Sequence, residues 1–448
     1  MHHPEDRIAN RSLNRRDFLW LAAVSTAGLA SGCAINPVTG QNQLMLLTEQ
    51  GEIAIDREHA PHQFSADYGA VQDPALNNYV SSVGHSMVGV THRPHMPYSF
   101  RCVNASYVNA YVFPGGSVGV TRGIMLEMQN EAELGALLGH ELAHVSARHT
   151  AARTSKVIMS ELILVGTVLA LSSRNEDWGV LAAGLGAVTA GALLARYSRA
   201  DERQADQLGV EYMTRSGYSP DGMVGLMDVL RRLQKRKPSA IEMMFATHPM
   251  SEDRYRAALV NAQTTFRSDR HLPIHRERYM DHTVGLRNIK SAIEKMQESE
   301  KHMVQRRFLA AEGLLKDVLQ QVPRDYGGLM LMAKCQLALD RPNRAEYFAD
   351  KARSVYPQEA QAHHLSGIAK LGMKRYGEAH AMFTTYERML PGNPNTVFLI
   401  GSSLEGMGRR GQAAEQYLRF SRMVHSGEKY QYAQGRLVEW GYVAPSAQ

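Results

Sequence analysis

Residues 130–144 read Asn130-Glu-Ala-Glu-Leu-Gly-Ala-Leu-Leu-Gly-His-Glu-Leu-Ala-His144, and this stretch decides the fold around it. Its leucines recur at helical spacing, so the stretch predicts a helix with an apolar face. Positions four apart lie on one face of a helix, so His140 and His144 can present imidazole nitrogens to one Zn²⁺. Glu141, one step round the helix, then faces the water on the metal. The pattern is typical of a zinc hydrolase.

A catalytic zinc site usually has three protein ligands and one open position, so a third ligand is needed. His149 and Glu202 are the candidates. The spacing HExxHxxGxxH of another zinc peptidase class would require glycine at Ala147 and histidine at Thr150, so His149 fits poorly and is interpreted as a polar helix-end residue. Glu202 fits better, because Asp206 lies four residues further on and can accept the second N–H of a ligand histidine.

Several motifs together resemble the gluzincin family of CAAX prenyl proteases and HtpX-type peptidases. They are His140-Glu-Leu-Ala-His144, Glu202-x-x-x-Asp206, Thr247-His248-Pro249 with Arg254, and the strand-and-turn segment from Asn109 to Val120. The resemblance covers roughly residues 40–260. It implies a zincin-like α+β domain that is mostly helical with a small β-sheet.

The resemblance also implies a role for each matching residue. One Zn²⁺ per chain is expected, with His140, His144 and Glu202 as its ligands. Glu141 is expected to be the general base that takes a proton from the metal's water and returns it to the leaving amine. Asp206 is expected to lie behind the ligands and to orient a histidine.

The roles of two further residues, His248 and Arg254, follow less directly from the motif. His248 matches a loop histidine that can approach the metal and close the site, or contact the substrate oxyanion. Arg254 matches the family pattern too, but Glu252 and Asp253 beside it offer ordinary surface salt bridges. Both interpretations of Arg254 stay open at the level of sequence.

The segment that precedes the metal helix suggests how substrate binds. Asn109, Ala110 and Tyr111 are expected to lie on a strand to which an extended polypeptide can add as a further strand. Such pairing depends on backbone more than on side chains. We therefore expect unfolded or flexible polypeptide as the substrate.

The amino terminus predicts export. Asn14-Arg-Arg-Asp-Phe-Leu19 precedes a short apolar run at 20–30, which Ala30-Ser-Gly-Cys33 follows, so residues 1–32 are expected to be a removed signal peptide. The paired arginines resemble a twin-arginine signal. The residues before Cys33 resemble a bacterial lipobox, with Ala30 where leucine is usual, and predict lipidation of Cys33. Ala34 is compatible with sorting to the outer membrane.

Residues 157–195 contain two apolar runs separated by a polar turn. Each run is shorter than the roughly 20 residues that a bilayer requires, and Glu161 interrupts the first. We expect a buried or interfacial helical hairpin beside the active site.

A repeat with a period of 34 residues begins after residue 300. The small residue of each repeat is Ala311, Ala345, Ala379 or Ala413. Four residues later, a bulky side chain stands in three of the four units, at Leu315, Phe383 and Tyr417, and Ala349 takes this place in the second unit. A proline recurs at Pro323, Pro357 and Pro391. These are the period and positions of tetratricopeptide repeats. Stacked helix pairs of this kind form an α-solenoid whose concave surface suits peptides or partner proteins.

The combined prediction is a peptidase domain at 33–275 followed by a repeat domain at 290–440. The expected function is zinc-dependent endopeptidase activity on misfolded or unassembled envelope proteins, in a periplasm-facing lipoprotein of the outer membrane, with recruitment of the outer-membrane assembly machinery through the repeats. The formal charge of +6 comes without a basic block, so no nucleic-acid partner is expected. The alternatives are a lipid-anchored chaperone or scaffold whose peptidase site is latent because His248 blocks the zinc, and a processing protease that cuts one folded partner.

Overall fold

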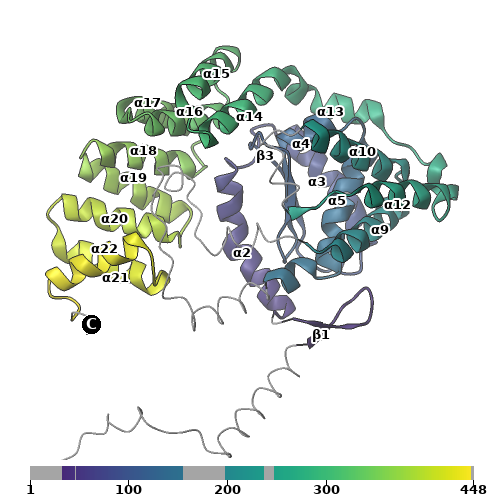
Figure 1. Cartoon of the computed structure of the whole chain (residues 1–448), viewed down its shortest axis with the longest axis horizontal. Helices are drawn as coiled ribbons and strands as arrows, with labels where there is room; N and C mark the ends of the chain where they lie inside the picture. Colours follow the sequence, from purple (N-terminus) through teal and green to yellow (C-terminus); the bar gives the residue numbers. More distant parts are fainter. Residues whose placement is uncertain (1–32, 46, 155–196, 237–246, 445–448) are drawn as a thin grey trace, which may run out of the picture.

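The computed structural model describes residues 33–45, 47–154, 197–236 and 247–444. The predicted signal peptide at 1–32 and the predicted hairpin at 157–195 lie outside these residues. Figure 1 shows two parts: helices around a small sheet on one side, and an arc of paired helices from α14 to α22 on the other. Within the described residues, no helix combines the length and the apolar character that crossing a membrane requires.

A three-stranded sheet lies at the centre of the first part. Strand β3 (Ser99–Val103) runs parallel to β5 (Ser117–Thr121), and β4 (Ala110–Val112) pairs with the other side of β5 in the antiparallel sense. In the order β3-β5-β4, strand β4 lies at the edge of the described sheet. This is the segment for which strand addition is predicted.

The predicted metal helix is α5 (Glu131–Ser146), and every one of its residues is buried. Asn130 caps it by accepting a hydrogen bond from the Glu133 backbone N–H. Helix α9 (Arg199–Arg215) crosses α5 closely, because a Cβ built on Gly139 would lie only 2.9 Å from the Gly209 carbonyl oxygen. This contact between two glycines holds the histidines of α5 against the acidic residues of α9.

Further helices enclose this central pair. They are α2 (Glu49–Ala66), α3 (Pro74–Val88), α4 (Arg122–Glu127), α10 (Asp221–Arg236), α12 (Glu252–Gln263), the 3-10 helix η2 (Arg267–His271) and α13 (Arg276–Asn288). A two-stranded hairpin of β1 (Cys33–Ile35) and β2 (Asn42–Leu44) begins the described chain. Helix α13 lies between the two predicted domain ranges.

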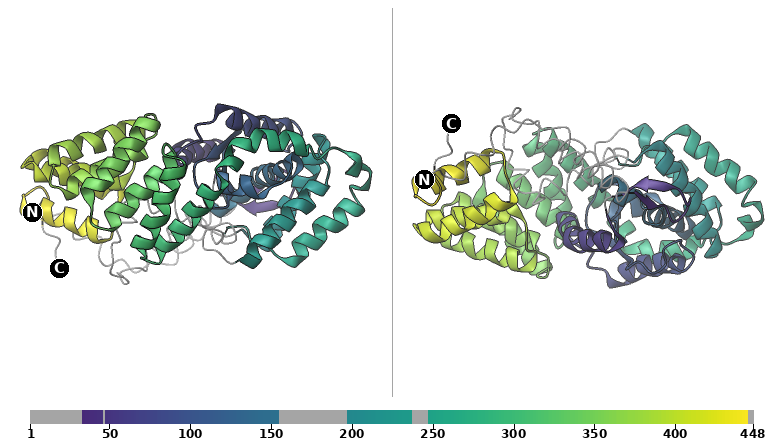
Figure 2. Two further views of the ribbon diagram at one scale, coloured as in Figure 1. Left: turned by 90° about the horizontal axis from the view of Figure 1, so that it is seen from above. Right: turned by 90° about the horizontal axis from the view of Figure 1, so that it is seen from below.

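The second part consists of stacked helices. They are α14 (Lys290–Val304), α15 (Phe308–Gln321), α16 (Tyr326–Ala338), α17 (Pro342–Val355), α18 (Gln361–Gly372), α19 (Tyr376–Met389), α20 (Pro394–Gly406), α21 (Arg410–Met423) and α22 (Glu428–Glu439). Figure 2 shows them extending away from the sheet-containing part, so that the molecule is elongated.

Small residues allow the repeat helices to pack closely. The four repeat alanines are all fully buried, as are Phe383 and Tyr417. A Cβ on Gly367 would lie 2.6 Å from the Phe383 ring, and one on Gly401 would lie 2.7 Å from Tyr417. The prediction of a mostly helical fold, in which a domain with a small β-sheet precedes tetratricopeptide repeats, is confirmed.

The two parts share one continuous apolar core cluster, and polar contacts reinforce their interface. Arg122 of α4 donates to Asp325 at 2.6 Å, and Lys334 of α16 donates to the Tyr68 hydroxyl at 3.1 Å. The Ser65 hydroxyl donates to Glu359. The repeats are therefore packed directly against the sheet-containing part.

Candidate metal centre

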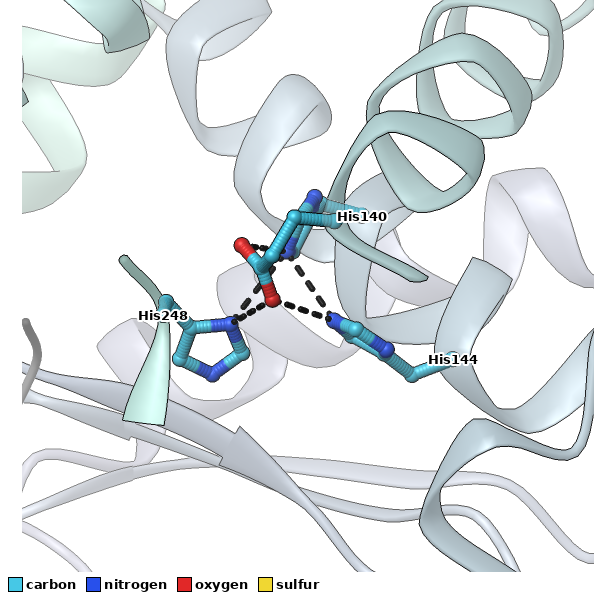
Figure 3. Close-up of side chains that lie close together, drawn as sticks. His140, His144 and His248 are labelled. Carbon is cyan, nitrogen blue, oxygen red and sulfur yellow. Dashed lines mark hydrogen bonds and ion pairs between the residues drawn. The ribbon is translucent and has the colours of Figure 1, made fainter. Parts of the chain in front are cut away.

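Four side chains converge between α5 and α9. His140, His144, Glu202 and His248 each offer one ligand atom, and these atoms all lie within 4.8 Å of one another (Figure 3). The Nε2 atoms of His140 and His144 are 3.1 Å apart, and Glu202 Oε1 lies 3.5 Å from His144 Nε2. All four residues are buried. The structure thus brings the three predicted ligands together.

Local sequence explains where Glu202 lies. Ser198 accepts a hydrogen bond from the Asp201 backbone N–H, and the Asp201 side chain accepts one from the Ser198 backbone N–H. This capping box starts α9 immediately before Glu202. The close crossing of α5 and α9 then directs the carboxylate at the two histidines.

Asp206 lies behind His140, as predicted, with Oδ1 3.0 Å from His140 Nδ1. This contact leaves His140 Nε2 facing the cluster. Burial alone would raise the pKa of Asp206, but the charge and hydrogen bonds of Arg254, together with His140, outweigh it and lower that pKa. Asp206 therefore carries its negative charge.

Arg254 belongs to the site and not to the surface. It is buried, and it lies 2.6 Å from both Glu202 Oε2 and Asp206 Oδ1. Of the two interpretations left open by the sequence, the structure supports the one that places Arg254 in the motif. Its guanidinium compensates the buried Glu202 carboxylate and the partly buried Asp206 carboxylate, which would otherwise repel each other.

His248 approaches the cluster from a loop. Its Nδ1 lies 3.1 Å from Glu202 Oε1 and 3.4 Å from His140 Nε2, and its Nε2 lies 3.9 Å from Glu141 Oε1. Burial would raise the pKa of Glu202, but electrostatic interaction with the nearby His248 and the hydrogen bonds from His144 and His248 lower that pKa well below its usual value. The distances to Glu202 and His140 place His248 where a fourth metal ligand would lie.

Glu141 lies beside the cluster without belonging to it. It is 1% exposed, and its Oε2 has no hydrogen-bond partner among the described residues. Burial raises the pKa of Glu141, although nearby His248 and His140 oppose that rise. A carboxylate with an uncommitted oxygen and an elevated pKa is suited to accept a proton.

The residues fit a zinc ion. Two imidazoles and a carboxylate are the donor set of several catalytic zinc sites, and here they are buried and mutually close. The uncommitted oxygen of Glu141 adjoins them.

Two side chains contact His144 in ways that the sequence did not predict. His149 is buried at the start of the helical segment that follows α5, and its Nδ1 lies 3.0 Å from His144 Nδ1, a contact that its interpretation as a polar helix-end residue did not include. Helix α5 ends at Ser146, and His149 folds back after it. The Tyr197 ring stacks on His144 with centroids 3.8 Å apart. No spacing rule indicates either contact.

The strand predicted to bind substrate is present as β4, but some of its side chains are not free to contact a substrate. Ala110 pairs with Val120 in the antiparallel ladder, and Asn109 Oδ1 is buried with no partner in the described part of the chain. The Tyr111 hydroxyl donates to Asp67 at 2.5 Å, so its side chain is committed to the interior. Tyr111 can therefore contribute only its backbone to a substrate.

A fully buried HExxH helix joined by a carboxylate from a later helix is the arrangement that the resemblance to gluzincin metallopeptidases predicts. Residues 74–261 match the family described as peptidase family M48, and residues 303–368 match the tetratricopeptide repeat. This chain therefore has a region similar to peptidase family M48, and a region similar to tetratricopeptide repeats follows it.

Named relatives share the peptidase region. The chain is 29% identical over 238 residues to the beta-barrel assembly-enhancing protease of Yersinia pestis, covering 52% of this chain and 48% of that protein. It is 32% identical over 196 residues to the putative beta-barrel assembly-enhancing protease of Vibrio cholerae, covering 41% and 38%. The metalloprotease YcaL of Escherichia coli is 28% identical over 210 residues, covering 46% and 75%. The chain thus spans about half or less of the first two relatives.

Proposed function

We propose that this protein is a zinc-dependent endopeptidase of the bacterial cell envelope that hydrolyses misfolded or unassembled envelope and outer-membrane proteins. The observation that carries the proposal is the buried cluster of His140, His144 and Glu202 beside the uncommitted oxygen of Glu141. Its chemistry matches peptide hydrolysis, and the M48 match supports the same reaction.

Each residue of the site has a distinct task. His140, His144 and Glu202 would hold the zinc, which when bound supplies a Lewis acid that polarises a peptide carbonyl and acidifies water. Glu141 accepts the proton of the attacking water through Oε2 and delivers it to the leaving amine. Asp206 orients His140, while Arg254 keeps the two carboxylates of α9 charged.

The fold supports an extended substrate. Strand β4 lies at the edge of the described sheet, so an unfolded segment can add to it by backbone hydrogen bonds. The repeats offer a second surface, suited to partner recruitment. Two relatives are named for enhancing beta-barrel assembly, and from that name we infer a link to outer-membrane protein assembly.

The proposed location depends on the amino-terminal sequence. The paired arginines and the small residues before Cys33 support export and attachment to the outer membrane through a lipid. Metabolic labelling with palmitate tests this directly. The wild-type chain should incorporate label and Cys33→Ala should not; an unlabelled wild type would contradict lipidation.

Cleavage of a flexible protein tests the enzyme proposal. The full-length chain should cleave casein or urea-unfolded porin, and Glu141→Gln should lower the rate about 10²- to 10⁴-fold while keeping its zinc, because it loses only the proton acceptor. Glu252→Gln, which alters an exposed carboxylate of α12, is the control. Equal cleavage by wild type and Glu141→Gln would contradict the proposed mechanism.

The position of His248 supports a second candidate function. Because His248 lies close to Glu202 and His140, it could bind the zinc and block the open coordination position. The peptidase site would then be latent, and the protein would act as a chaperone or scaffold that binds partners through the repeats. In that case the wild type binds zinc without cleaving, and His248→Ala gains cleavage. If His248→Ala instead cleaves more slowly than an active wild type, His248 assists catalysis and the latent-site function is wrong.

A further inference from the structure

The two zinc-facing histidines of α5 have different partners on their outer nitrogens. His140 Nδ1 lies 3.0 Å from the carboxylate of Asp206. His144 Nδ1 lies 3.0 Å from another imidazole nitrogen, Nδ1 of His149. His149 Nε2 in turn lies 2.8 Å from Gln204 Oε1. A chain of two hydrogen bonds therefore leads from His144 to α9.

The hydrogen atoms of this chain can be placed in only one way if His144 is a ligand. Its Nε2 faces the cluster and needs a free lone pair, so the ring hydrogen resides on Nδ1. That N–H donates to His149 Nδ1, which must accept. The hydrogen of His149 then resides on Nε2 and donates to Gln204 Oε1, an atom that can only accept.

The backbone is shaped to bring His149 to this place. Arg148 has a left-handed φ of 59°, which reverses the chain immediately after α5. The Arg148 guanidinium donates to Glu52 at 2.6 Å and to the Leu47 carbonyl at 2.7 Å, and Glu52 is fully buried. These contacts hold a conformation that a non-glycine residue rarely adopts.

The ring plane of His144 is fixed as well. Tyr197 stacks on it at 3.8 Å with an interplanar angle of 17°, and the Arg153 guanidinium lies over the Tyr197 ring at 4.1 Å. Arg153 and His149 belong to the same short segment that follows Arg148. This segment therefore supports His144 both at its edge and on its face.

We propose that His149 and Gln204 are a positioning pair that fixes the tautomer and orientation of His144 for zinc. The inference rests on the proposed zinc site but not on the proposed substrate. It assigns His149 a role outside the ligand set, where its Nδ1 acts as an acceptor. Outer partners of this kind typically contribute 10- to 100-fold to metal affinity.

Matched substitutions distinguish the effect of the hydrogen-bond acceptor on His149 from the effect of its side-chain volume. In His149→Asn the side-chain oxygen occupies nearly the place of the histidine Nδ1, so the variant keeps an acceptor for His144. His149→Leu fills similar space without one. At the other end, Gln204→Leu removes the terminal acceptor, and Gln207→Leu makes the same chemical change at an exposed position of α9.

The test is zinc affinity of the full-length protein, measured by competition with a chromophoric chelator. His149→Leu should bind zinc about 10- to 100-fold more weakly, Gln204→Leu should be weakened less, and His149→Asn and Gln207→Leu should stay within a few-fold of wild type. Circular dichroism of the zinc-free proteins establishes that each variant is folded. Gln204→Leu, further from the ligands, serves if His149→Leu does not fold.

The outcomes distinguish this inference from the proposed function. Equal zinc affinity of folded His149→Leu and wild type overturns the positioning role, whatever the peptidase does. Equal weakening in His149→Asn and His149→Leu also overturns it, because volume or helix packing is then responsible. A wild type that binds zinc tightly and cleaves nothing overturns the peptidase proposal and leaves the positioning pair in place.

Discussion

The metal centre and the repeat array differ in the side chains that they bury. Around α5 and α9, the fully buried positions include charged or ionisable groups, among them Glu202 and His144. In the repeats they are mainly apolar, among them Ala379 and Phe383. Burying charge costs free energy unless it is compensated, whereas burying apolar surface stabilises. The metal centre therefore depends on stability that apolar packing elsewhere in the molecule supplies.

The largest expected difference concerns zinc. Glu202→Gln removes a charged ligand, so zinc affinity should fall by more than the roughly 10- to 100-fold expected for losing an outer partner. The repeat helices should keep their circular dichroism. Chelator competition is the measurement, with Glu252→Gln in an exposed part of α12 as control. Unchanged zinc affinity in Glu202→Gln would remove Glu202 from the ligand set.

The next largest effect is expected at the ion pair between Arg122 and Asp325, which joins the sheet-containing part to the repeats. Asp325→Asn leaves the buried Arg122 guanidinium without its carboxylate partner, and we expect a loss of about 3–5 kcal/mol in the free energy of unfolding. Asp221→Asn breaks the exposed pair with Arg270 and should cost less than about 1 kcal/mol. Urea denaturation followed by circular dichroism compares the two. Similar small losses would show that the interface is not coupled electrostatically.

The same pair predicts an acid dependence. Burial would raise the pKa of Asp325, but the charge and hydrogen bonds of Arg122 outweigh it, so the folded-state pKa lies below the ordinary aspartate value of 3.8. The stability from this pair is therefore fully present above about pH 4 and is lost as pH falls toward the folded-state pKa. Melting temperatures of wild type and Asp325→Asn should converge in that acidic range. A constant difference down to pH 2 would contradict the assignment.

The smallest effects contrast two glycines of the repeat helices. Gly367→Ala forces a methyl group against Phe383 and should destabilise by about 1–3 kcal/mol. A Cβ on Gly435 of α22 meets nothing within 4 Å, so Gly435→Ala should stabilise by roughly 0.5–1 kcal/mol through helix propensity. Thermal unfolding of the two variants measures whether each substitution lowers or raises the stability. Stabilisation by both substitutions would mean that packing at Gly367 is looser than described.

Short-range periodicity explains what the sequence could predict. The spacing of His140 and His144 fixes one face of a helix, and the 34-residue recurrence of alanine fixes the helix pairs. Glu202 could be found because Asp206 lies four residues beyond it and because the motifs resemble a known family. These features depend on residues close together in the chain or on a regular repeat.

Contacts made by irregular backbone could not be predicted in the same way. His149 reaches His144 because Arg148 adopts a left-handed conformation, which its own residue type does not favour. The sequence left Arg254 open between the motif and a surface salt bridge with Glu252 or Asp253, and the packing of α12 on α9 buries it beside Glu202 and Asp206. Tertiary packing decided both cases.

The most direct test of the account is X-ray absorption at the zinc edge, with metal content, on the full-length protein and on Glu202→Gln. We predict one zinc per chain in the wild type, surrounded by nitrogen and oxygen ligands that include at least two imidazoles, and marked loss of zinc in Glu202→Gln. A third imidazole in the wild type would place His248 on the metal. A wild type that takes up no zinc after incubation with it would contradict the central claim that these residues form a metal centre.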